Sequence, residues 1–267
     1  MVIEEGSLTT APVPLRKPRA RHGLNSAGPH DRPAFAFGWK RSGSVPLSIN
    51  ANYWIMKLLI IGATGATGRE TVSQALTQGH AVTALVRDCT KATFVPPVKK
   101  AVGDVLDVCS LEKALTGQEA VICSLGSAVS GPIKEMTLFS EGTRNLVAAM
   151  KSQGVSRLIC ITGIGAGNSK GHGPWYYNWL IQPLVLRGVY KDKTRQEEIV
   201  RGSGLVWTLV RPTILTNGGA KGVGAVQVFT QLAEIHVSKI CRADVAAFCL
   251  RELADGRFQG QAPVITY

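Results

Sequence analysis

The sequence lacks an apolar run long enough to cross a membrane. A membrane-spanning helix needs roughly 18 to 20 apolar residues in succession, and polar or charged residues interrupt every apolar stretch of this chain earlier than that. It also lacks the apolar stretch of a secretory signal peptide. Because hydrophobic residues still make up 45% of the chain, we expect a soluble protein with one substantial core.

The cysteines form no CxxC pair, and no group of cysteines and histidines has the spacing of metal ligands. We therefore expect no metal site. Several cysteines fall within predicted strands or helices, which is typical of reduced thiols in a core. That pattern favours a reducing compartment, so we predict a cytoplasmic protein. The six are Cys89, Cys109, Cys123, Cys160, Cys241 and Cys249.

Acidic residues are scarce: 18 Asp and Glu stand against 30 Lys and Arg, a formal net charge of +12. Such an excess attracts polyanions. The chain nevertheless contains no Lys/Arg-rich run with interleaved aromatic residues, which a nucleic-acid surface would favour. We expect a solvated basic surface with a site for an anionic cofactor, and neither nucleic acid nor membrane as a partner.

The first 50 or so residues have no helical or strand period and hold six of the thirteen prolines, a composition typical of a disordered tail. A transit peptide is an alternative, because Arg21 to Ile55 contains one acidic residue, although Glu4, Glu5 and the scattered prolines argue against an amphipathic targeting helix.

A further alternative is that Met56 is the true start, because the residues from Met56 to Gly62 read like the opening strand of an α/β domain. We assign residues 1–55 to a disordered tail or a mis-assigned extension. Residues 56–267 are expected to form one domain.

From Met56 onward the pattern alternates between strand and helix with short joints and no internal repeat. Such alternation predicts an α/β fold, a doubly wound parallel sheet with helices on both faces. The expected strands are 57–61, 81–86, 98–102, 120–125, 157–162, 207–210 and 263–267. The expected helices are 68–77, 110–115, 136–152, 175–186, 193–201 and 242–253.

A glycine-rich loop joins the first expected strand to the first expected helix. Gly62 permits a sharp turn, Gly65 lets the backbone approach a phosphate, and Gly68 lets the helix pack on the strand. Thr64 and Thr67 add hydroxyl donors, and the helix N-terminus presents backbone N–H groups to an anion. The loop in this position predicts a Rossmann-type dinucleotide site.

The end of the second strand indicates which dinucleotide is bound. An NAD site usually has an acidic residue about 20 residues after the loop, whereas this chain has Arg87 followed by Asp88. A guanidinium forms charge-assisted hydrogen bonds to a 2′-phosphate, and Lys91 adds a second positive charge. We predict NADP, with a solvated strand-end arginine as the alternative.

Two later strand ends complete the expected cofactor site. Asp104, after the third strand, is placed to accept a hydrogen bond from the adenine amine, although an ordinary turn explains it equally well. Gly126, after the fourth strand, lets the backbone lie close to the cofactor.

With these motifs assembled, the chain resembles the atypical short-chain dehydrogenase/reductase families with an NAD(P)H-binding domain, closest to the flavin reductase/biliverdin-IXβ reductase branch. The resemblance covers Met56 to Tyr267 and is carried by the glycine loop and four further segments. These are Ala84–Asp88, Gly103–Leu106, Ser140–Asn145 and Ser203–Pro212.

The resemblance implies residues for each part of NADPH: the loop for the diphosphate, two cations for the 2′-phosphate, and strand-end residues for the adenine and ribose. The implied residues are Gly62, Thr64, Gly65, Ala66, Thr67, Gly68, Arg87, Lys91, Asp104, Val105, Leu125 and Gly126.

The chain departs from biliverdin-IXβ reductase at three positions that matter for chemistry. Thr162 is followed by Gly163 where that enzyme has a serine, Thr213 stands in place of a histidine, and Ala128 in place of an arginine. These departures argue against tetrapyrrole reduction.

The Tyr-x-x-x-Lys pair of common short-chain dehydrogenases is also missing. The one match, Tyr53 to Lys57, precedes the first strand and cannot reach the sheet's carboxyl edge. Tyr190 and Lys193 have the wrong spacing, although related reductases carry an Asp-Lys-x-x-Gln-Glu pattern there, matched from Asp192 to Glu197. Lys193 is therefore expected either near the nicotinamide or as a solvated residue at a helix start.

The aromatic segment 175–181 follows a glycine-rich stretch, as a lid over a planar substrate would, but ordinary packing or an oligomer contact explains it equally well.

We interpret the chain as an NADPH-dependent oxidoreductase that transfers hydride to a small planar acceptor such as a flavin or quinone. Thr162, Lys193 and Thr213 are the expected catalytic-site residues, with positional roles in one cleft. The alternative is a non-catalytic NADP-binding regulator of the NmrA-like kind. We expect a monomer or weak homodimer.

Overall fold

The computed structural model describes residues 55–126, 136–172, 186–235 and 237–267. The predicted tail therefore lies outside the described residues, apart from Ile55. Ala128 and the aromatic segment 175–181 also lie outside them, and the predictions for these segments stay predictions.

An eight-stranded sheet organises the domain, in the order β3-β2-β1-β4-β5-β6-β10-β8. All neighbours pair in parallel except β8, which runs antiparallel to β10. The chain crosses over between β1 and β4, the switch point at which doubly wound sheets bind ligands. The strands are β1 Lys57–Ile61, β2 Ala81–Val86, β3 Lys99–Val102, β4 Ala120–Cys123, β5 Arg157–Ile161, β6 Val206–Pro212, β8 Gln227–Phe229 and β10 Val264–Thr266.

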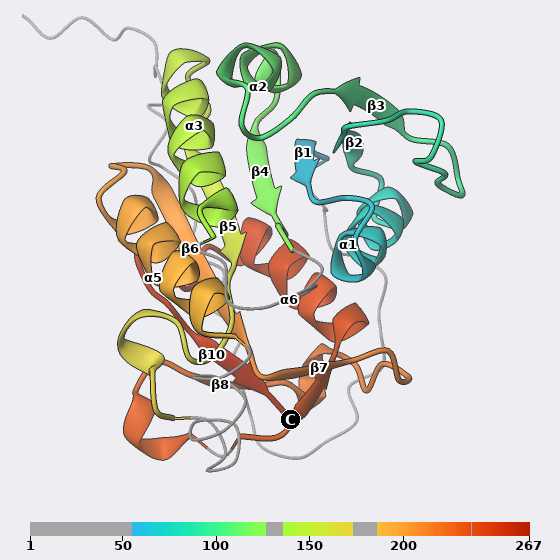
Figure 1. Cartoon of the computed structure of the whole chain (residues 1–267). Coiled ribbons are helices and arrows are strands. Elements are labelled where there is room, and N and C mark those ends of the chain that lie inside the picture. Colours follow the sequence, from blue (N-terminus) through green and yellow to red (C-terminus); the bar gives the residue numbers. More distant parts are fainter. Residues whose placement is uncertain (1–54, 127–135, 173–185, 236) are drawn as a thin grey trace, which may run out of the picture. The chain divides into compact units, whose positions relative to one another are not determined.

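Helices cover both faces of this sheet, which confirms the predicted α/β class (Figure 1). The helices α1 (Ala66–Thr77) and α6 (Arg242–Asp255) pack together on one face. The helices α2 (Val108–Leu115), α3 (Leu138–Ser152) and α5 (Arg187–Arg201) pack on the other. Within the described ranges, short 3₁₀ helices lie in connections at Gly167–Ser169, Val223–Ala225 and Leu232–Glu234.

The apolar run of β1 explains why the sheet needs two covered faces. Successive side chains of a strand point to opposite faces. Leu58 and Ile60 join the core beneath α1 and α6, whereas Leu59 and Ile61 join the core beneath α3 and α5. All four are essentially inaccessible to solvent. Each such side chain stabilises the fold by about 1.5 to 3 kcal/mol.

The predicted element boundaries differ from the structure mainly where tertiary packing decides them. The helix expected at Lys193 begins instead at Arg187, because the backbone N–H of Tyr190 already donates to Leu186. A separate two-stranded parallel sheet of β7 (Ile214–Thr216) and β9 (Lys239–Cys241) was not predicted. Three-residue strands are too short to show a sequence period.

Four of the cysteines are buried, as expected of core thiols, and none of the six is in a disulfide. Cys109 is exposed and Cys89 is half-buried, so the expectation of core thiols is wrong for Cys109. Among the described residues, no helix combines the length and the apolar character needed to span a membrane.

Candidate functional site

The glycine loop after β1 is packed so tightly that side chains are excluded from it. Gly62 has a φ of +74°, and a Cβ atom there would lie 2.4 Å from the carbonyl oxygen of Ser124. A Cβ on Gly68 would lie 2.1 Å from the carbonyl oxygen of Gly62. Both contacts are with backbone atoms, which cannot move aside without disturbing the loop. The two glycines therefore shape a cradle that no other residue type can form.

The N-terminus of α1 opens above this loop without any group of its own to fill it. Gly65 is the N-cap, no side chain caps the helix, and no acidic residue stands in the first turn. The N–H groups of Ala66, Thr67 and Gly68 therefore have no acceptor within the helix. Thr64, Gly65 and Ala66 are exposed. The cradle thus fits a dinucleotide diphosphate, held by N–H groups and the positive helix end.

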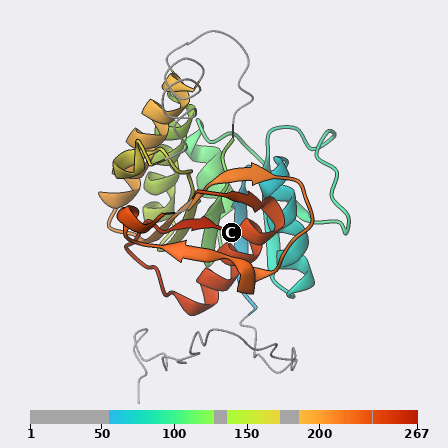
Figure 2. The same ribbon diagram turned by 90° about the horizontal axis from the view of Figure 1, so that it is seen from below.

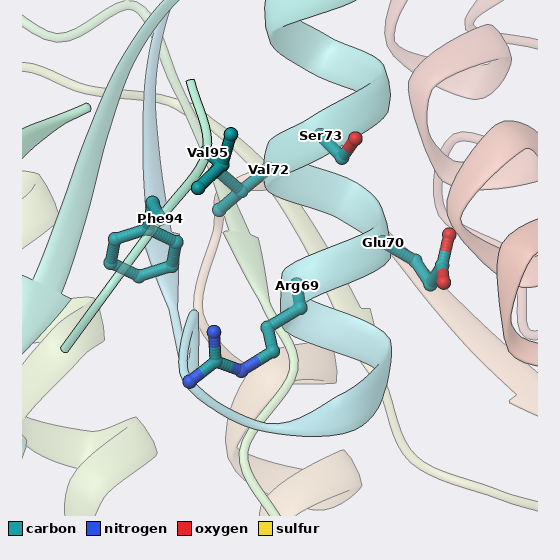
Figure 3. Close-up of a pocket in the computed structure, with 6 residues that line it drawn as sticks. All are labelled: Arg69, Glu70, Val72, Ser73, Phe94 and Val95. Carbon is teal, nitrogen blue, oxygen red and sulfur yellow. The ribbon is translucent and has the colours of Figure 1, made fainter. Parts of the chain in front are cut away.

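Arg69 ties this loop to the segment after β2, a role that the sequence analysis missed. Its Nε donates to the carbonyl oxygen of Thr64 at 3.1 Å, and its Nη1 to that of Thr93 at 2.7 Å. Figure 3 shows the Arg69 side chain leaving α1 on the side where Phe94 lies, and its guanidinium carbon is 5.7 Å from the centre of that ring. Both residues line a cavity of about 220 Å³. The sequence feature that could have indicated this role was the position of Arg69, directly after the last glycine of the loop. Arg69 joins the loop to the segment that carries Lys91.

The end of β2 offers the cations expected at a 2′-phosphate. Arg87 is exposed, and within the described part of the chain nothing forms a hydrogen bond or ion pair with it. Asp88 accepts from the backbone N–H of Thr90 at 2.9 Å and from its hydroxyl at 2.6 Å. These hydrogen bonds from Thr90 lower the pKa of Asp88. Lys91 forms an exposed 3.3 Å ion pair with Asp88, a contact worth little.

The expected adenine side is built from the turn after β3 and the start of α3. The Asp104 carboxylate accepts the N–H of Leu106 at 2.9 Å, which holds the turn. Val105 is buried and lies 2.9 Å from the position of a Cβ on Gly142, with Leu125 at 3.6 Å from the same point. Gly142 therefore lets α3 approach Val105 and Leu125. The exposed Gly126 follows, at the last described residue of that segment.

A second cavity, of about 250 Å³, lies at the carboxyl ends of β5 and β6. Figure 2 views the domain from the end at which the C-terminal strands lie. Thr162 and Thr213 both line the cavity, as expected of residues in one cleft. Tyr190 lines it too, although its spacing from Lys193 had argued against a catalytic pair. Its walls are otherwise mainly apolar and include Ile164, Pro212, Leu215 and Val237.

Thr162 belongs to a buried ion-pair network beside this cavity. Its hydroxyl donates to Oε1 of Glu197 at 2.8 Å, and Arg211 Nε donates to the same oxygen at 2.9 Å. Arg211 Nη2 donates to Oε2 of Glu197 and to Asn168 at 2.7 Å. A Cβ on Gly167 would lie 2.5 Å from Glu197, so that glycine lets the loop rest on the pair. The network thus anchors the loop after β5.

Lys193 is not among the residues that line this cavity, and its burial shows that the alternative of a solvated lysine is wrong, whereas its place near the nicotinamide stays a prediction. It is buried rather than solvated, and its ammonium nitrogen lies 4.2 Å from the centre of the Phe139 ring. Burial lowers the pKa of Lys193, against the opposing influence of Cys160, Cys123, Glu197 and Asp192. The sequence showed the pattern but not the direction of the side chain.

The other residues of the Asp-Lys-x-x-Gln-Glu pattern connect α5 to its neighbours. Asp192 accepts the N–H groups of Phe139 at 2.8 Å and Ser140 at 3.3 Å, and so caps α3. Gln196 donates to Thr143 at 2.9 Å. All of them are buried on one face of α5. The pattern therefore marks a helix interface, and its Glu197 also accepts a hydrogen bond from the cavity-lining Thr162.

Comparison with known proteins agrees with an NAD(P)H-binding domain. A family model described as NAD(P)H-binding matches residues 62–256. An uncharacterised chloroplastic protein of Arabidopsis thaliana is 31% identical over 204 residues, which cover 73% of this chain and 71% of that protein. The photosystem II assembly factor Ycf39 of Cyanophora paradoxa is 29% identical, over 74% of this chain and 59% of its own length. An NAD(P)H azoreductase of Xenophilus azovorans is 26% identical, over 78% of this chain and 67% of its own length.

Solved structures share the fold. The anaerobilin reductase ChuY from Escherichia coli O157:H7 matches with a TM-score of 0.64 and 24% identity, over 78% of this chain and 96% of that one. A short-chain dehydrogenase/reductase from Veillonella parvula, solved in complex with NADP, has a TM-score of 0.64 and 19% identity, over 80% of this chain and 95% of that one. At these identities the likeness is one of fold.

Proposed function

This chain belongs to the NAD(P)H-binding family of Rossmann-fold proteins, and from that premise we propose that it is an NADPH-dependent reductase of small planar acceptors such as flavins and quinones. One observation carries the proposal: a largely apolar cavity of about 250 Å³ lies at the carboxyl edge of the sheet, the edge at which such sheets gather their ligands. Within the family we place the chain near the flavin reductase branch.

The choice of NADPH rests on Arg87 and Lys91. Both side chains lie at the end of β2, where a dinucleotide presents its adenosine ribose. A guanidinium engaged by no other group in the described chain is available for charge-assisted hydrogen bonds to a 2′-phosphate. The carboxylate of Asp88, which would favour NAD, is engaged by Thr90 and Lys91 instead.

The protein's own residues would bind, orient and exclude water. NADPH supplies a hydride, which carries both electrons of the reaction. The apolar walls of the cavity hold a flat acceptor and keep bulk water from its face, while Thr162 and Thr213 orient its polar edge. A flavin that accepts the hydride needs one further proton to become the neutral dihydroflavin, and water at the open side supplies it. No side chain has to act as an acid.

Steady-state turnover tests this function. Purified protein is mixed with NADPH and, in turn, lumiflavin, riboflavin and a benzoquinone, and NADPH oxidation is followed by absorbance. We expect turnover that Gly68→Ala abolishes, because the added Cβ would meet backbone at 2.1 Å. Gly224→Ala is the matched control, since a Cβ there would meet nothing within 4 Å. An inactive wild type with every acceptor would refute the reductase.

A second candidate is a non-catalytic NADP-binding regulator of the NmrA-like kind. The burial of Lys193 against Phe139 favours it, because that ammonium is withdrawn from the cavity. The relative Ycf39 is named as a photosystem II assembly factor. Tight NADPH binding together with no turnover on the same acceptor panel would favour this candidate.

A further inference from the structure

We propose that Thr162 selects acceptors that carry an N–H group, such as the imide edge of a flavin, over acceptors that carry only carbonyl oxygens, such as quinones. The inference rests on the proposed reductase function and adds the substrate class. It follows from the direction in which the Thr162 hydroxyl points its single proton.

Glu197 takes that proton. The Thr162 hydroxyl donates to Oε1 of Glu197 at 2.8 Å, and Arg211 holds the same carboxylate through both of its oxygens. Glu197 and Arg211 are each about 1% exposed, so water does not compete for the contact. A hydroxyl has one proton to donate and two lone pairs with which to accept. The Thr162 oxygen is therefore left with accepting capacity alone.

That accepting capacity is unused within the protein. In the described part of the chain, no N–H or O–H group donates to Thr162 Oγ1. Thr208 provides the contrast, since it also donates to a buried glutamate, Glu252, at 3.0 Å. The oxygen of Thr208 in turn accepts from Arg157 at 2.9 Å. The structure thus satisfies Thr208 internally but leaves Thr162, which lines the cavity, to a ligand.

Any group that reaches the Thr162 oxygen from the cavity must donate a hydrogen bond. The pyrimidine edge of a flavin has an N3–H between two carbonyl groups, whereas a quinone offers carbonyl oxygens only. When two hydrogen-bond acceptors face each other, both oxygens stay without a hydrogen bond. The cost corresponds to a loss of about 5-fold to 150-fold in binding affinity or kcat/KM. The hydroxyl therefore favours flavins.

The test compares lumiflavin with 3-methyllumiflavin, which differ only at N3, where a methyl group replaces the proton. We expect wild-type protein to prefer lumiflavin by about 5-fold to 150-fold in kcat/KM at saturating NADPH. Thr162→Val should remove the preference, and Thr162→Ser should restore it. Thr208→Val is the matched control, because it breaks the equivalent bond away from the cavity and should keep the preference. A ratio of two acceptors does not depend on the folded fraction.

Three results would overturn the inference: equal use of the two flavins by wild type, a preference that survives in Thr162→Val, or an equal loss on all acceptors with a raised KM for NADPH. The last would assign Thr162 to the carboxamide of the nicotinamide. If wild type turns over no acceptor, the reductase proposal fails by itself. Binding of the two flavins to the NADP⁺-loaded protein, measured by fluorescence, then decides the selectivity.

Discussion

The two ends of the sheet each bury an arginine, a glutamate and a threonine, with different consequences. At the amino ends of the strands, Arg157 at the start of β5 pairs with Glu252 of α6 at 3.0 Å, and Thr208 completes the cluster. Burial lowers the pKa of Arg157, against the attraction of Glu252. This amino-edge cluster joins β5, β6 and α6.

The carboxyl-edge cluster of Arg211, Glu197 and Thr162 uses the same chemistry at the opposite end. There the loop after β5 rests on the ion pair, and Thr162 faces a cavity. Buried ion pairs by themselves say little about function, since they occur wherever the geometry compensates the loss of hydration. The comparison teaches that position relative to the strand ends, rather than residue type, separates a structural cluster from a site.

The largest predicted effect comes from breaking each cluster. Glu197→Gln and Glu252→Gln should each lower the free energy of unfolding by about 3 to 5 kcal/mol, because a buried arginine is left without its counter-charge. Urea unfolding measures this. Only Glu197→Gln should also weaken the preference for lumiflavin. A carboxylate can only accept the Thr162 proton, whereas an amide can also donate to the Thr162 oxygen. An equal change of preference in Glu252→Gln would break the distinction between the two edges.

A smaller effect is expected at the carboxyl end of β2. Arg87→Ala should lower the affinity for NADPH by about 10-fold to 150-fold. This corresponds to the loss of one hydrogen bond to a charged group, roughly 1.5 to 3 kcal/mol. NADH affinity should hardly change. Calorimetric titration at fixed ionic strength measures both, with Lys57→Ala as a control that removes an exposed cation at the start of β1. Equal losses for the two nucleotides would show that Arg87 is not at the 2′-phosphate.

The smallest effect concerns pH and the amino edge. His80, just before β2, is buried and accepts the N–H of Met56 on Nδ1 at 3.2 Å. Burial lowers its pKa below the ordinary value of 6.5. The unfolded chain therefore takes up the proton first as pH falls below 6.5. Stability should be complete above that pH and decline through the window between 6.5 and the lower folded pKa.

Urea unfolding at several pH values, compared with His80→Asn, checks this prediction. The difference between the two proteins should vary with pH in that window and become constant above it. NADPH affinity should not follow the same curve, because His80 lies away from the carboxyl edge. A stability difference that is independent of pH would mean that His80 keeps the same protonation in the folded and unfolded states.

Local pattern was sufficient for the first two strands and for the glycine loop between β1 and α1. The strands 57–61 and 81–86 were predicted with the bounds that the structure has, because each is a short apolar run ended by a loop residue. The glycine loop was equally readable, since its spacing reflects contacts within a few residues: Gly68 meets Gly62. Arg69 was missed because its partners include Thr93, 24 residues away.

The cavity at the carboxyl ends of β5 and β6 could not be predicted in the same way. Lys193 and Tyr190 share α5, yet the lysine turns toward Phe139 while the tyrosine lines the cavity. Sequence spacing alone does not say which face of a helix meets a sheet edge and which meets another helix. The short strands β7 and β9 bring Leu215 into the cavity wall through pairing across 25 residues of chain.

The sequence by itself therefore determined the α/β alternation, the glycine loop after β1 and the position of Arg87 at the end of β2, because each depends on neighbours close in the chain. Only the tertiary structure decided what Thr162 can do. Its proton is directed by Glu197, 35 residues later, and that carboxylate is held in turn by Arg211 on the adjacent strand. A hydroxyl rotates freely until partners far along the chain orient it, so its role is a property of the folded state.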